Sequence, residues 1–96
     1  MKKIKLDDLY KLDNFKVRVN NVKESTDIQK AIFSKNFTWR GFLESQSIKE
    51  DKHIGYLYFD NDIDNRVKQL SWSKVENSEA YFNNHKNQEV EVLWNS

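Results

Sequence analysis

The chain has 96 residues, of which 38% are hydrophobic and 32% are charged, so it has the length of one domain and no room for a second core. A formal net charge of +1 removes the strong electrostatic case for a dedicated DNA-binding protein. Cysteine is absent, which excludes disulfide scaffolds, thiolate metal sites and cysteine nucleophiles. The longest apolar run is too short to span a membrane and the N-terminus lacks a signal-peptide core. We therefore expect a cytoplasmic protein with no membrane partner.

Two short segments near the N-terminus have different periodicities. Leu6, Leu9 and Tyr10 recur at helical spacing, which predicts a short helical turn. From Phe15 to Val19, apolar residues alternate with polar ones. This alternation predicts a half-buried strand with a basic outer face.

The next segment predicts the main helix. Thr26 and Gln29 fit a capping box, so we expect the helix to begin at Thr26. Ile28 and Ile32 form its apolar stripe, Gln29 should face water, and Asn36 is a suitable stop.

From residue 37 onward the pattern is mainly extended. Residues 37–45 favour extended structure, 46–53 form a polar loop, and 54–59 give the strongest strand signal. An acidic turn over 60–65 should join that strand to a second one over 66–72, as a hairpin.

The last part of the chain predicts a helix and a strand. Ser78 is a good cap for a short helix over 78–85, and Val90, Val92 and Trp94 alternate as in a strand. Residues 1–96 therefore predict a single α+β domain, with an antiparallel sheet of about five strands and two short helices.

The acidic turn resembles part of a calcium-binding loop. Asp60, Asp62 and Asp64 occupy its first, third and fifth positions. Asn65 stands where the pattern needs Gly, and Ser71 stands where it needs a bidentate Glu. We therefore interpret the segment as an acidic turn without a metal.

Catalytic and cofactor motifs are incomplete as well. His53 and His85 have no companion ligands at metal-binding spacing. The two glycines of the chain, Gly41 and Gly55, are too few for phosphate-binding loops or a nucleophile elbow. We expect no metal, no cofactor, no catalytic residues and no enzymatic activity.

Charge is distributed unevenly along the chain. Residues 1–48 contain ten basic and six acidic side chains, whereas residues 49–96 contain six basic and nine acidic ones. This asymmetry predicts two faces of opposite sign if the fold keeps the halves apart.

One segment interleaves basic and aromatic side chains. Lys35, Phe37, Trp39 and Arg40 combine the groups that stack bases and neutralise phosphates in binders of single-stranded nucleic acid. Core aromatics flanked by unrelated charges are the more ordinary interpretation, because the net charge is near zero. RNA or single-stranded nucleic-acid binding is therefore our alternative function.

Exposed aromatic rings are the other candidate feature. Two short helices cannot cover both faces of such a sheet, and Tyr56 and Tyr58 lie on one face of the central strand. Uncovered aromatic and Arg side chains dominate binding energy at interfaces. The predicted partner-binding residues are Trp39, Arg40, Tyr56, Tyr58, Asp60, Asp62, Asp64 and Trp72.

A further pattern combines the segments Asn21–Ser25, Ile28–Phe33, Trp39, Tyr56–Asp60, Ser78–Phe82 and Glu89–Val90. In this combination the chain resembles small, mostly uncharacterised proteins encoded by bacteriophages and prophages. The resemblance implies a protein that inhibits a host defence factor, of restriction or CRISPR type, by stoichiometric contact with a host protein or nucleoprotein complex. Aspartates of the acidic turn could then imitate phosphates. A self-associating structural protein is a third hypothesis, and the sequence leaves the oligomeric state open.

Overall fold

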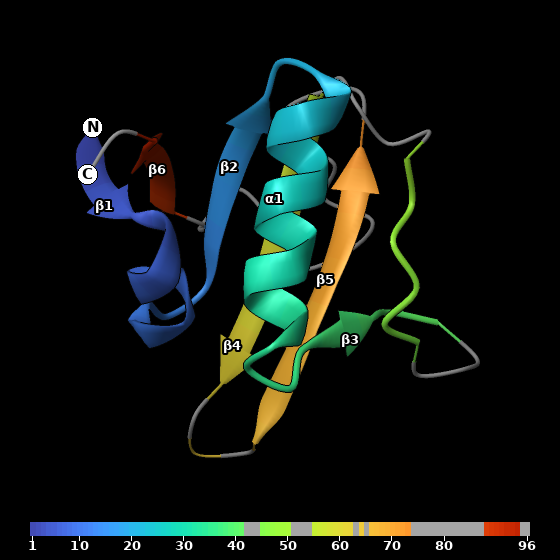
Figure 1. The fold of residues 1–96 in the computed structure, drawn as a ribbon. Helices are drawn as coiled ribbons and strands as arrows, with labels where there is room; N and C mark the ends of the chain where they lie inside the picture. The colour runs from blue at the N-terminus through green and yellow to red at the C-terminus, as the bar shows by residue number, and fades with distance from the viewer. Residues whose placement is uncertain (42–44, 51–54, 63, 65, 74–87, 95–96) are drawn as a thin grey trace.

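A computed structural model of the chain describes residues 1–41, 45–50, 55–62, 64, 66–73 and 88–94. These residues form an α-helix and a 3-10 helix on a mixed sheet (Figure 1). The elements are β1 (Lys2–Lys5), η1 (Leu6–Lys11), β2 (Phe15–Val19), α1 (Val22–Phe33), β3 (Thr38–Trp39), β4 (Gly55–Asp62), β5 (Val67–Ser73) and β6 (Gln88–Leu93). The helix predicted over residues 78–85 and both histidines lie outside the described residues.

The sheet has six strands in the order β1-β6-β2-β4-β5-β3. Only β2–β4 and β4–β5 are antiparallel, whereas β1–β6, β2–β6 and β3–β5 are parallel. The α+β class is thus confirmed, but the prediction of about five antiparallel strands was wrong. Parallel pairing requires crossover connections. Here η1 lies between β1 and β2, and α1 lies between β2 and β3.

The topology also mixes the two halves of the sequence. β6 pairs with both β1 and β2, and β3 pairs with β5. Strands from the basic first half and strands from the acidic second half are therefore interleaved, although β4 and β5 of the second half are neighbours. The halves are not kept apart, so the condition for two faces built from separate halves is not met.

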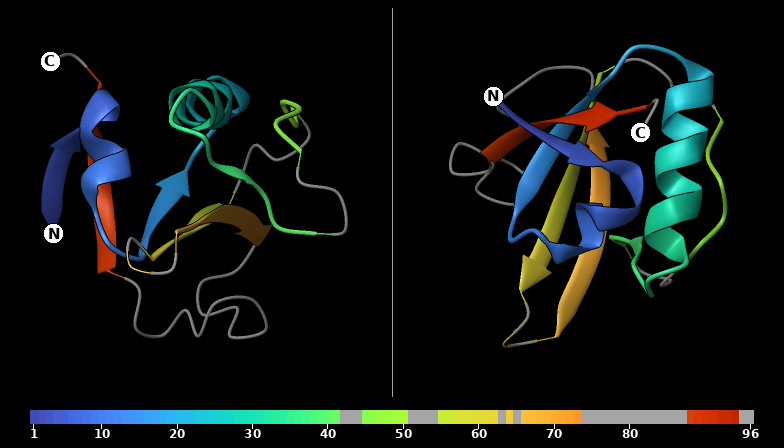
Figure 2. Two further views of the ribbon diagram at one scale, coloured as in Figure 1. Left: turned by 90° about the horizontal axis from the view of Figure 1, so that it is seen from below. Right: turned by 60° about the vertical axis from the view of Figure 1, so that its left-hand side comes forward.

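α1 covers one face of the sheet (Figures 1 and 2). Val17 pairs with Leu57 across β2–β4, and both are buried in the core on this face. Phe15 and Phe59 stack with ring centroids 4.3 Å apart. The buried core comprises Leu9, Phe15, Val17, Val19, Ile28, Ile32, Phe33, Phe37, Trp39, Leu57, Phe59, Leu70, Val90 and Val92. We call the opposite side of the sheet the outer face.

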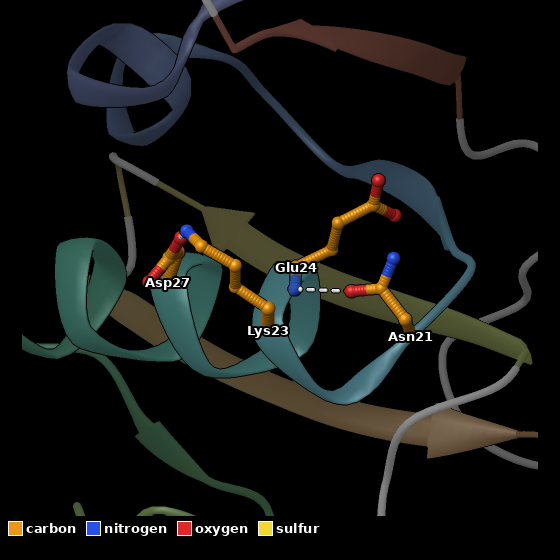
Figure 3. A network of polar contacts seen from close by, with 4 residues as sticks. All are labelled: Asn21, Lys23, Glu24 and Asp27. Atoms are coloured by element: carbon orange, nitrogen blue, oxygen red, sulfur yellow. Dashed lines mark hydrogen bonds and ion pairs between the residues drawn. The ribbon is translucent and has the colours of Figure 1, made fainter.

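α1 begins one turn earlier than predicted. Asn21 is its N-cap, and the Asn21 side chain accepts a hydrogen bond of 2.9 Å from the Glu24 backbone N–H (Figure 3). The Glu24 carboxylate in turn accepts a 3.0 Å hydrogen bond from the Asn20 N–H. The prediction of a start at Thr26 was wrong, because Asn caps a helix as well as Thr does and lies upstream. Exposed Lys23 and half-buried Asp27 form a 2.8 Å ion pair on this first stretch of helix (Figure 3).

The predicted stop at Asn36 is confirmed. Asn36 adopts a left-handed φ of 70°, and its N–H donates to Phe33 O at 3.1 Å. The Phe37 N–H donates to Ile32 O at 3.4 Å, which completes a Schellman motif. Phe37 and Ile32 are both buried, as the hydrophobic contact of this motif requires.

Gln29 is fully buried, so the prediction that it faces water was wrong. Its Oε1 accepts a hydrogen bond of 2.7 Å from Lys49 N, and its Nε2 donates to Lys49 O at 3.0 Å. The Trp39 indole N–H donates to Ser47 O at 2.8 Å. Hydrogen bonds from buried side chains thus hold residues 45–50 beside α1. Helical periodicity alone cannot indicate that Gln29 has these backbone groups as partners.

Candidate functional site

The sheet separates the predicted partner-binding residues onto its two faces. Phe59 pairs with Leu70, and Leu70 pairs with Trp39, so Trp39 lies on the α1 side. Leu57 pairs with Trp72, which places half-buried Trp72 on that side as well. The outer face receives Tyr56, Tyr58, Asp60 and Asp62, because side chains alternate along β4.

Trp39 is a core residue. Its side chain is 6% exposed and makes an edge contact with Phe33 at a centroid distance of 5.9 Å. Phe37 beside it is fully buried. The expectation of an exposed Trp39 ring was wrong, and of the basic-aromatic segment only Lys35 and Arg40 are exposed. A run of alternating aromatics fits a strand interior as well as it fits a binding surface.

The side chains at the centre of the outer face are buried. Tyr56 and Tyr58 do lie on the same face, with ring centroids 6.1 Å apart. Tyr58 has no exposed surface, however, and Lys16 on the neighbouring strand is only 7% exposed. The expectation that this face stays uncovered was therefore wrong at its centre, although Tyr56 is half-buried.

The aspartates lie at the end of the outer face. Asp60 and Asp62 belong to β4 itself, so the acidic turn is shorter than predicted, and exposed Asp64 lies in it. We call these three residues the acidic row. Partial burial and the nearby Asp62 raise the pKa of Asp60, whereas Arg40 opposes that increase. The row therefore places three carboxylates at the end of the β4–β5 hairpin, with the Arg40 guanidinium near Asp60.

A groove with a volume of about 880 Å³ lies beside the same end of the hairpin. Its walls come from η1, the segment between α1 and β3, β3 itself, the end of β4, the turn before β5 and the start of β5. The lining residues in the described part of the chain are Tyr10, Lys11, Asn36, Thr38, Asn61, Arg66, Val67, Lys68 and Gln69. We call it the basic groove, because three of these side chains are cationic and none of them is a carboxylate.

Asn61 joins the hairpin to the wall of the basic groove. It is 2% exposed, and its side-chain amide donates to the backbone carbonyls of Tyr10 and Leu12. Its backbone N–H donates to Asn14 Oδ1 at 2.9 Å. These bonds fix the position of Tyr10, over whose ring the Lys35 ammonium lies 4.7 Å from the centroid.

Sequence reasoning missed the basic groove, because its cations are distant in the chain. Lys11 and Arg66 are brought together only by the attachment of the hairpin to η1. The lone Asn61 in a strand of aromatics and aspartates was the available signal, since a buried amide requires specific partners.

The described part of the chain shows no metal centre and no membrane span. Within it, no group of three His, Cys, Asp or Glu side chains could hold a metal ion. None of its helices has the length and apolar character needed to cross a membrane.

Comparison with known proteins provides no assignment for these two surfaces. The acidic row and the basic groove must therefore be interpreted from their own chemistry. No protein-family model, curated protein or solved structure significantly matches the chain.

Proposed function

We propose that this is a non-enzymatic binding protein that inhibits a host defence factor of restriction or CRISPR type by stoichiometric contact. The observation that carries the proposal is the acidic row at the end of β4. Asp60 and Asp62 are spaced two residues apart on one side of a strand, about 7 Å in an extended chain. Carboxylates held at fixed spacing can occupy the positions of phosphates in a basic nucleic-acid channel.

The cost of holding the charge of Asp60 supports a role in binding. The raised pKa of Asp60 means that the fold disfavours the ionised form, and desolvation is its main cause. A neutral side chain at this position would avoid that cost. Groups that oppose stability in this way are typical of functional surfaces.

Association through the described sheet edges is a less suitable mode of action. The edge strand β1 carries exposed Lys2, Lys3 and Lys5, and lysines on an edge disfavour the addition of another strand. The other edge strand, β3, has only two residues. The proposed partner is therefore a basic protein surface, in a host protein or nucleoprotein complex, and not a second sheet.

The test is nuclease inhibition at increasing molar ratio, with a panel of purified CRISPR effector complexes and restriction endonucleases as targets. We expect at least one target to be inhibited at a ratio near one to one. The combined variant D60N/D62N/D64N should then weaken inhibition at least tenfold, which corresponds to about 1.4 kcal/mol.

The matched control removes three exposed carboxylates elsewhere. The variant D7N/E50Q/E91Q changes the net charge by the same amount and leaves the acidic row intact. It should inhibit as the unmodified protein does. Equal losses in the two variants, or no inhibited target in the panel, would overturn the proposal.

A further inference from the structure

The basic groove concentrates positive charge in a protein that is almost neutral. The net charge of the chain is +1, yet Lys11, Arg66 and Lys68 line one concave site. Asp8 forms a 3.1 Å ion pair with Lys11 outside the lining, and the Lys11 side chain remains 59% exposed. A concave site lined by one sign of charge raises the local concentration of ligands of the other sign. The charge of the groove therefore favours an anionic ligand.

An aromatic ring accompanies these cations. Tyr10 lines the basic groove and is half-buried, with the Lys11 and Lys35 ammonium groups 5.7 Å and 4.7 Å from its ring centroid. Aromatic rings next to Lys and Arg bind single-stranded nucleic acid by combining base stacking with phosphate contacts. An acidic peptide would use the cations but has no general need for the ring.

Asn61, which lines the groove, carries a buried hydrogen-bond acceptor. Asn61 Oδ1 is buried and has no hydrogen-bond partner among the described residues, because the amide nitrogen of that side chain makes both described bonds. An unused acceptor beside a ligand site favours a ligand that carries donors. Nucleobase N–H groups, including the imide N–H of thymine and uracil, are such donors, whereas ionised phosphate and carboxylate groups are not.

The backbone around the groove is unusual at two positions. Asn36 and Arg66 are the two non-glycine residues with positive φ in the described part of the chain, at 70° and 57°, and both line the groove. Asn36 is explained by the end of α1. Arg66 is conformationally unfavourable there, because a left-handed conformation costs about 1–2 kcal/mol for a residue with a Cβ. An arginine at this position supplies a cation that Gly or Asn would not.

The acidic row limits the size of the ligand. Asp60 and Asp62 lie on the outer face of the hairpin whose end lines the groove. A duplex that extended past the groove would meet this negative surface, whereas one flexible strand can follow the groove alone.

We infer that the basic groove binds single-stranded nucleic acid, with phosphates at Lys11, Arg66 and Lys68 and a base against Tyr10. This site is separate from the acidic row and goes beyond the proposed contact with a protein. Together the two surfaces would suit a partner that contains both protein and nucleic acid.

The test is fluorescence anisotropy of the full chain with labelled single strands of oligothymidine and oligouridine of about 12 nucleotides. Three phosphate contacts on a single strand predict that the logarithm of the affinity falls with a slope of about −2 against the logarithm of salt concentration. The variant K11Q/K68Q should weaken binding at least tenfold and reduce the slope by about 1.4. Y10L should weaken it about fivefold or more without changing the slope.

Matched variants separate the groove from general electrostatics. K2Q/K30Q removes two exposed lysines outside the groove and should leave both affinity and slope within twofold of the unmodified protein. Circular dichroism of each variant verifies that it is folded. Absence of binding at low salt, or equal losses in the two lysine variants, would overturn the inference.

Two further ligands decide the chemical class. A polyglutamate peptide of the same length should bind at least tenfold more weakly than oligothymidine. If the peptide bound equally well and Y10L left its affinity unchanged, the groove would be a peptide site and the assignment would be overturned. Duplex DNA should bind more weakly than its separated strands. These titrations contain no defence factor, so an absence of oligonucleotide binding would not affect the test of the proposed inhibition. The variant D60N/D62N/D64N should retain oligonucleotide binding.

Discussion

The two sides of the β4–β5 hairpin carry opposite charge although they share the same strands. The outer face ends in the acidic row, and the α1 side ends at the basic groove, with Lys68 paired to Asn61. Alternation of side chains along β4 produces this separation, since Asp60 and Asp62 flank Asn61 in sequence and lie on the opposite face. A near-zero net charge therefore says little about local charge, because alternation along a strand places neighbouring side chains on opposite faces of the sheet.

The largest expected effect distinguishes the buried amide from the exposed acids. Asn61→Ala should lower the free energy of unfolding by about 2–4 kcal/mol, because the carbonyls of Tyr10 and Leu12 lose their buried donors. Urea unfolding measures the change. Asp64→Ala in the exposed turn is the control and should change stability by less than about 0.5 kcal/mol. Similar losses of stability in the two variants would contradict the idea that the buried hydrogen bonds of Asn61 stabilise the fold more than the exposed Asp64 does.

A second buried amide on the α1 side should behave in the same way. Gln29→Ala should cost about 1.5–3 kcal/mol, because both backbone groups of Lys49 lose their partner. Gln29→Glu keeps the shape and an acceptor but loses the donor to Lys49 O, so it should also destabilise. A neutral Gln29→Glu variant in thermal unfolding would contradict the described hydrogen bonds.

A smaller effect is expected at the exposed start of α1. Asn21→Ala should lower stability by about 1 kcal/mol, because the Glu24 N–H loses its cap. Asn20→Ala preserves the backbone N–H that bonds to Glu24 and serves as the control. Equal stability of the two variants in urea unfolding would show that the Asn21 side chain does not cap α1.

The smallest effect concerns the acidic row and has the opposite sign. Because the folded chain raises the pKa of Asp60, the folded state binds this proton more tightly than the unfolded chain does. The stability from this protonation is present below the ordinary pKa of 3.8 and is lost as pH rises through the higher pKa of the folded state.

Asp60→Asn should therefore raise the melting temperature slightly at neutral pH, and this gain should vanish in acid. Thermal unfolding at several pH values measures it, with Asp64→Asn as the exposed control. A gain that persisted below the ordinary pKa would mean that charge is not its cause.

Local patterns predicted the elements whose signals are local. The strand over Phe15–Val19 and the stop at Asn36 were correct, because alternation and a left-handed Asn act within a few residues. β1 was missed, because three lysines around a single Ile4 give no strand signal until β6 pairs with them. The pairing directions were also missed, since they depend on which strands become neighbours.

The site was harder to predict than the fold. Gln29 and Asn61 were not recognised as buried, because the polar partners that make their burial favourable are 20 and about 50 residues away. The three aspartates of the acidic row were identified, but Asp60 and Asp62 were placed in a turn and not in β4, since Asp is depleted in strands. The basic groove could not be predicted from any contiguous motif.

The insertion of β6 between β1 and β2 has a consequence for synthesis. Among the described strands, β1 pairs only with β6, which follows β5 in the chain. During synthesis, β1 therefore has no sheet partner among the described strands until β6 has been translated. The exposed lysines of β1 disfavour premature association of this strand in that interval.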